Sequence, residues 1–147
     1  MLRALKAFFP AVLLAYALAS ILATQSNLGN LQMLGMEVGP GVRAEATFHD
    51  LIGMASSYLL LILVAFVLGL PVAAGLTRLL PDQRALLYAL AGFTAIVALH
   101  LIMKVVLGIS GIAATRTTAG LIGQGAAGAV GGLCFHWLSR PRQPTDH

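Results

Sequence analysis

A few polar residues stand inside otherwise apolar stretches of the sequence, and these are the places where chemistry could occur. Imidazole nitrogens can bind metals, haem iron or protons, an ammonium group can bind anions, and hydroxyl and amide groups can orient a ligand. Ionisable side chains at membrane depth are costly and therefore often functional. The candidate binding residues are His49, Ser56, Ser57, His100, Lys104 and Gln124.

The spacing of these residues predicts a single polar layer near one membrane face. If the surrounding stretches are helices, His100 lies about 10 Å from the helix end at Leu107, and Gln124 lies roughly 8 Å from Ala119. Ser56 and Ser57 are at similar depth, and Lys104 and His49 would lie above the layer. The same groups can instead form hydrogen bonds that join neighbouring helices. We favour that structural role for His100, and more strongly for His136, which is expected at the other face.

Signatures of catalysis are absent from the sequence. There is no glycine-rich phosphate loop, no metal-binding His/Cys spacing and no nucleophile elbow, and Ser110 has no base beside it in sequence. The lone Cys134 cannot form a disulfide within the chain. We expect no catalytic residue, no metal and no cofactor, and therefore a protein that is not an enzyme.

The composition requires lipid as the solvent for most of the chain. Hydrophobic residues make up 59% of the 147 residues and charged residues only 10%, whereas about 25% are charged in a typical soluble domain. The net charge of +4 comes from basic residues at the ends of apolar stretches. Membrane anchoring explains such a distribution, and nucleic acid is not an expected partner.

Four apolar stretches have the length that crosses a hydrocarbon core of about 30 Å. The sequence predicts an all-α membrane protein, a bundle of four transmembrane helices that forms a single domain over residues 1–147. The expected helices cover about 7–24, 51–70, 85–107 and 119–138. Pro71 should kink the second helix, which then extends to about residue 80.

The longest connection, residues 25–50, is expected to be an outer loop. Its glycines, with Gly39-Pro40-Gly41, indicate turns, yet Leu28–Val38 is too apolar for a solvated loop. The segment either folds onto the headgroup layer or contacts a partner protein. Thr47 and Asp50 are expected to cap the start of the second helix.

The distribution of basic residues predicts the orientation. By the positive-inside rule both termini are cytoplasmic, with a cytoplasmic tail at 139–147. Ala17-Leu18-Ala19 resembles a signal-peptidase site, but the apolar run continues past it, so we expect a retained first helix. Six basic residues lie on the expected inner side, against Arg43, Lys104 and Arg116 on the other: Arg3, Lys6, Arg78, Arg84, Arg140 and Arg142.

Small residues recur every four positions in the fourth stretch, which places them on one helix face. Such stripes let a second backbone approach closely. The residues expected to pack another helix, within the chain or in a second copy, are Ala119, Gly120, Gly123, Ala127, Gly128, Gly131 and Gly132.

These features favour a multi-pass inner-membrane protein that acts as a non-enzymatic accessory or scaffold subunit. Besides the lipid bilayer, its partner would be a larger membrane protein or a second copy of the chain. The alternative is a small homo-oligomeric transporter or channel, although no carboxylate lies inside an apolar stretch. A weaker alternative is a quinone- or haem-binding electron-transfer protein centred on His100.

Overall fold

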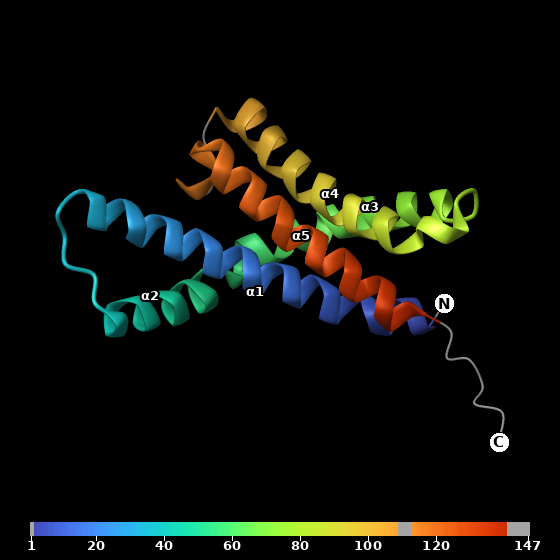
Figure 1. Ribbon diagram of the computed structural model, residues 1–147, viewed down its shortest axis with the longest axis horizontal. Helices are drawn as coiled ribbons and strands as arrows, with labels where there is room; N and C mark the ends of the chain where they lie inside the picture. Colours follow the sequence, from blue (N-terminus) through green and yellow to red (C-terminus); the bar gives the residue numbers. More distant parts are fainter. Residues whose placement is uncertain (1, 109–112, 141–147) are drawn as a thin grey trace, which may run out of the picture.

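Every regular element of the structure is a helix in the part of the chain that it describes. The computed structural model describes residues 2–108 and 113–140 (Figure 1). Four helical segments are long and apolar enough to cross a membrane: Leu2–Met33, Ala55–Leu76, Pro81–Val106 and Thr118–Ser139. These four segments indicate a multi-pass membrane protein.

The first helix, α1 (Leu2–Met33), continues well past the predicted end at residue 24. Its 32 residues correspond to about 48 Å at the helical rise, more than a hydrocarbon core of about 30 Å. Gly35, with a φ of 85°, then makes the left-handed turn that reverses the chain. Figure 1 shows the end of α1 (light blue) reaching beyond the other long helices.

The expectation that residues 25–50 form a loop is wrong, because most of this segment is helical. Residues 25–33 continue α1, and α2 (Pro40–Gly53) packs back against it. Pro40 suits the first helical turn because its missing N–H would be unpaired there anyway. We call the two antiparallel segments together, residues 24–53, the hairpin, and the end of the molecule that carries it the hairpin end.

The capping role expected of Thr47 is also wrong, because α2 begins seven residues earlier, at Pro40. The Thr47 hydroxyl donates to the carbonyl of Arg43 within the helix. Asp50 accepts instead from the Thr24 hydroxyl, at 2.7 Å. Both side chains therefore hold the hairpin together rather than start a helix.

The second predicted span is built from two helical types. A π-helical turn, η1 (Ala55–Leu59), leads into α3 (Leu60–Leu76). The helix passes through Pro71 and ends at Leu76 rather than extending to residue 80, and residues 77–79 form a turn. A proline within a membrane helix is tolerated where neighbouring groups compensate for its missing hydrogen bond.

The last two spans agree with the predicted bounds to within one residue. A short 3₁₀ turn, η2 (Pro81–Gln83), precedes α4 (Arg84–Leu107), which ends at Gly108 with a left-handed φ of 66°. A second turn, η3 (Ala113–Arg116), leads to α5 (Thr118–Ser139). The Thr117 hydroxyl caps α5 by accepting from the Gly120 N–H. The part of the predicted tail beyond residue 140 lies outside the described residues.

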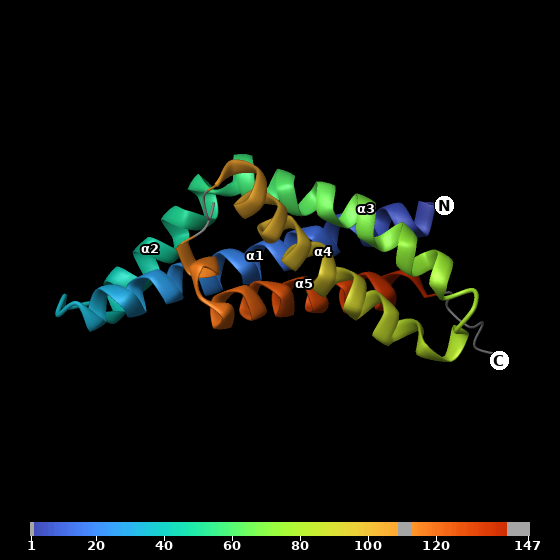
Figure 2. The same cartoon turned by 90° about the horizontal axis from the view of Figure 1, so that it is seen from above.

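Helix α5 lies between α1 and α4, and α3 packs on α4 (Figures 1 and 2). The start of α1, the end of α5 and the α3–α4 turn all lie at the end opposite the hairpin. We call this the arginine end, after Arg84 and Arg140. The centre of the molecule is filled by Val12, Ile62, Phe66 and Ile96, none more than 2% exposed.

Glycines bring α4 and α5 into backbone contact. A Cβ atom on Gly92 would overlap the carbonyl oxygen of Gly128, and one on Gly128 would overlap that of Gly92. One turn further, Gly132 lies equally close to the carbonyl of Tyr88. Close approach of this kind replaces the hydrophobic driving force that lipid removes.

The remaining small residues of the predicted stripe divide between several surroundings. Gly131 faces α1, where an added Cβ would come 2.7 Å from that of Ala15, and Ala127 is buried. Gly120 abuts the carbonyl of Ala114. Gly123 is loosely packed and Ala119 is exposed. The central part of the stripe therefore packs against other helices of the same chain.

Candidate functional site

A buried hydrogen-bond network joins all four spans in the half of the molecule nearer the hairpin. The Tyr58 hydroxyl donates to Oε1 of Gln124 at 2.7 Å and lies 3.1 Å from Nε2 of His100. Gln124 in turn donates from Nε2 to the carbonyl of Ala19 at 3.0 Å. Tyr58, His100 and Gln124 are 3%, 4% and 0% exposed. We call these three side chains the polar layer.

The hydrogen bonds determine which ring nitrogen of a neutral His100 carries the hydrogen. The single hydroxyl hydrogen of Tyr58 is donated to Gln124, so Nε2 of His100 must be the donor to the Tyr58 oxygen. The other ring nitrogen, Nδ1, is then a bare acceptor, and it is buried with no hydrogen-bond partner in the described chain. Ser20 Oγ, on the buried face of α1, also has no hydrogen-bond partner in the described chain.

Tyr58 was missed by reasoning from the sequence, because a tyrosine in an apolar stretch is usually counted as core. It lies in the π-helical turn η1, and such turns are frequent at functional sites. The Tyr16 ring packs edge-on against it at 6.1 Å between centroids. Tyr16, Ser20 and Thr24 are spaced by four on the buried face of α1. That spacing was a signal in the sequence for a polar stripe leading to this site.

The structure brings together only two of the six residues predicted to form a site. His100 and Gln124 both contact Tyr58. Ser56 and Ser57 are exposed, because the turn η1 presents Tyr58 inward and its two preceding residues outward. His49 on α2 and Lys104 on α4 are also exposed and take no part in the polar layer.

A second polar cluster lies at the arginine end. Arg140 donates from Nε to Nε2 of His136 at 2.8 Å, so this imidazole is neutral and protonated on Nδ1. His136 is 2% exposed and its ring is 5.9 Å from that of Tyr88. The Arg84 guanidinium lies over the Tyr88 ring at 5.7 Å.

Apolar side chains separate the two polar clusters. On three of the four spans, residues one or two turns beyond the polar layer are fully buried and apolar: Val12 on α1, Ile62 and Phe66 on α3, and Ile96 on α4. Neither of the two largest apolar hollows nor the polar pocket at the hairpin end is lined by residues of both clusters. Within the described helices, an apolar layer therefore lies between the two polar clusters.

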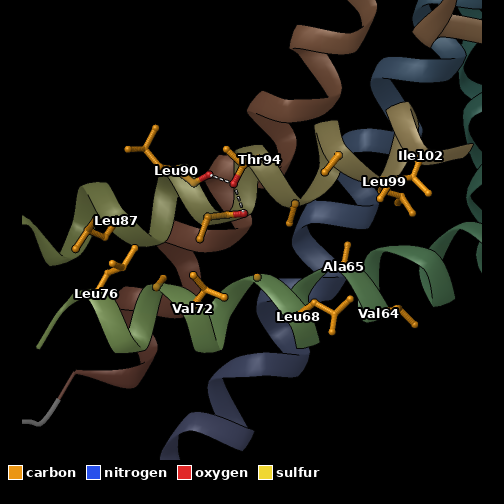
Figure 3. Close-up of a pocket in the computed structure, with 15 residues that line it drawn as sticks. Val64, Ala65, Leu68, Val72, Leu76, Leu87, Leu90, Thr94, Leu99 and Ile102 are labelled. Carbon is orange, nitrogen blue, oxygen red and sulfur yellow. Dashed lines mark hydrogen bonds between the residues drawn. The ribbon is translucent and has the colours of Figure 1, made fainter. Parts of the chain in front are cut away.

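Three hollows mark the surface of the described chain. A pocket of about 390 Å³ at the hairpin end is lined partly by polar groups, including Ser26, Asn30, Thr117 and Gln124. An apolar groove of about 640 Å³ runs between α3 and α4 (Figure 3). Its one hydroxyl, on Thr94, bonds to the carbonyl of Leu90 on its own helix at 2.7 Å, so the groove offers a ligand little but hydrocarbon contact. The third hollow, about 690 Å³, lies between α1 and α3.

Metal chemistry finds no support among the described residues, where no group of three His, Cys, Asp or Glu side chains could hold an ion. Comparison with known proteins adds no assignment. No protein-family model, no curated protein and no solved structure matches this chain.

Proposed function

We propose that this protein is a non-enzymatic accessory or scaffold subunit of a membrane assembly, and that the hairpin is its docking surface. In this proposal the four spans form a transmembrane bundle in the inner membrane, with the arginine end and both termini in the cytoplasm. The observation that carries the proposal is the hairpin, which extends beyond the spans and leaves most of its apolar side chains uncovered.

The uncovered apolar side chains lie on both arms of the hairpin and at its tip. Helix α2 buries none of its residues. Met33 and Leu34 at the tip are 88% and 79% exposed, and Phe48 and Ile52 on α2 are 68% and 78% exposed. Several large apolar side chains exposed on one protruding element are typical of a protein interaction site.

Polar contacts between its arms preorganise the hairpin. Arg43 donates to the side-chain oxygens of Gln25 and Gln32, at 2.6 and 2.7 Å. Gln25 also donates to the Thr47 hydroxyl at 3.1 Å. A surface that is already ordered loses less conformational entropy on binding. This supports a docking role rather than a connecting loop.

The partner is expected to be the part of a larger membrane protein that lies outside the bilayer. Helix α1 is longer than the hydrocarbon core by about 18 Å, so the tip is carried out of the lipid. The fourth span is the weaker candidate for the contact surface. Its central glycines pack within the chain, which leaves the hairpin as the stronger choice.

Site-specific photo-crosslinking in native membranes tests this proposal. A photoreactive residue in place of Phe48 should give one reproducible adduct with a larger protein, whereas the same residue in place of Val105, which is 82% exposed on α4, should not. Adducts between copies of the chain alone would favour the homo-oligomeric transporter or channel. If neither Phe48 nor Met33 gave an adduct, the result would contradict both the scaffold proposal and the homo-oligomeric alternative.

The electron-transfer alternative is checked by an absorption spectrum of the purified protein. Among the histidines that the structure describes, His49 is exposed, His100 is bonded to Tyr58 and His136 is bonded to Arg140, so these three offer no pair of free imidazoles for a haem. A Soret band would nevertheless overturn the scaffold proposal in favour of this alternative.

A further inference from the structure

We propose that the arginine end holds the phosphate of an anionic phospholipid between Arg84 and Arg140. This binding site is separate from the hairpin and does not depend on the scaffold proposal. It rests on the charges and ring contacts at that end, and on the third hollow, between α1 and α3.

The two guanidinium groups have no carboxylate partner within the described chain. Arg140 uses only Nε in its bond to His136, and its terminal nitrogens have no hydrogen-bond partner among the described residues. Arg84 contacts the face of the Tyr88 ring, and its Nε is buried with no hydrogen-bond partner among the described residues. The Tyr88 ring that Arg84 covers lies 5.9 Å from the His136 ring that Arg140 contacts, so the two positive charges lie in one neighbourhood.

Two like charges in one neighbourhood repel each other, and an anion between them removes this cost. Guanidinium groups bind phosphate oxygens through paired, charge-assisted hydrogen bonds. The contacts with Tyr88 and His136 fix both side chains before any ligand arrives, because each arginine is held against a buried ring. The cluster thus has the chemistry of a phosphate site.

The position of the cluster identifies a lipid as the source of the phosphate. Arg84 is the first residue of α4 and Arg140 directly follows the end of α5, so both lie at the boundary of the spans. Trp137, 65% exposed on the last turn of α5, is typical of the headgroup region. Basic pockets between membrane helices at this level bind anionic headgroups.

The third hollow, between α1 and α3, begins beside the cluster and can hold an acyl chain. The Phe135 ring packs against Tyr88 at 5.2 Å and also lines the hollow of about 690 Å³ between α1 and α3. Leu5, Phe8 and Leu70 form other parts of its wall. The Tyr88–Phe135 ring contact therefore places one wall of this hollow next to the arginine cluster.

Native mass spectrometry and thermal unfolding of the detergent-purified protein test the proposal. Phosphatidylglycerol should bind more tightly than phosphatidylcholine and raise the unfolding temperature. Arg84→Gln and Arg140→Gln should each weaken phosphatidylglycerol binding by about fivefold, and the double variant should weaken it further. Arg78→Gln is the matched control. Arg78 is exposed in the α3–α4 turn, and its substitution removes the same charge.

Three outcomes would overturn the proposal. Equal binding of the two lipids would remove the charge requirement. An equal loss in Arg78→Gln would show diffuse surface charge instead of a site. Stabilisation by inorganic phosphate alone, equal to that by phosphatidylglycerol, would identify a free anion as the ligand. Because Arg140 is exposed, its variant should fold even where Arg84→Gln does not, and it decides the result in that case.

Discussion

The Tyr58 hydroxyl donates a 2.7 Å hydrogen bond to Oε1 of Gln124, between residues that are 66 positions apart in the chain. Through it, the second span is tied to the fourth. Because Gln124 also donates to the carbonyl of Ala19 and Tyr58 contacts His100, one hydroxyl group connects all four spans. The stability of the molecule should depend on it.

Tyr58→Phe should lower the free energy of unfolding by about 1–2 kcal/mol. The substitution keeps the ring but leaves Gln124 Oε1 and His100 Nε2 buried without a partner. Thermal unfolding in detergent measures the effect. Ser57→Ala, at an exposed position of the same π-helical turn, is the control and should change stability little. Equal stability of both variants would show that the polar layer contributes nothing.

Gly128→Ala should destabilise the protein by about 1–3 kcal/mol, because the new methyl group forces α4 and α5 apart. The control is Gly29→Ala within α1, where an added Cβ meets no atom within 4 Å. Alanine is favoured over glycine inside a helix, so Gly29→Ala should be neutral or slightly stabilising. A Gly128 variant as stable as the Gly29 variant would contradict the close contact with Gly92.

Arg43→Met should loosen the hairpin without affecting the packed spans. The variant loses the hydrogen bonds to Gln25 and Gln32, so amide exchange within α2 should rise by about tenfold. Hydrogen–deuterium exchange resolved by mass spectrometry measures this segment separately from α5. Arg116→Met, which removes an exposed charge elsewhere, should leave α2 unchanged. An α2 exchange rate equal to that of the parent protein would mean that Arg43 does not order the hairpin.

The proposed orientation predicts which side of the membrane each end reaches. In a Cys134→Ala background, a single cysteine in place of Glu45 should react with a membrane-impermeant maleimide in intact cells. One in place of Arg78, in the α3–α4 turn, should react only after the membrane is opened. Both positions are exposed in the structure. The reverse pattern would invert the orientation and place the arginine end outside.

The sequence by itself determined the class of the protein and the boundaries of its last two spans. Apolar stretches long enough to cross a bilayer can only be helical there, since an isolated segment must satisfy its own backbone hydrogen bonds in lipid. The glycine spacing of the fourth span also indicated close packing, and depth estimates placed His100 and Gln124 at one level. These properties depend on local composition and helical periodicity alone.

Only the tertiary structure decided which of these residues meet. The direction in which a side chain points around a helix axis depends on neighbouring helices, and nearly uniform apolar stretches carry little sign of it. Ser56 and Ser57 therefore point outward, while Tyr58 takes the inward position beside His100. The hairpin was hidden for a related reason. Its arms are held by contacts such as Thr24–Asp50 across 26 residues, and a local pattern of glycines and apolar residues does not encode contacts at that separation.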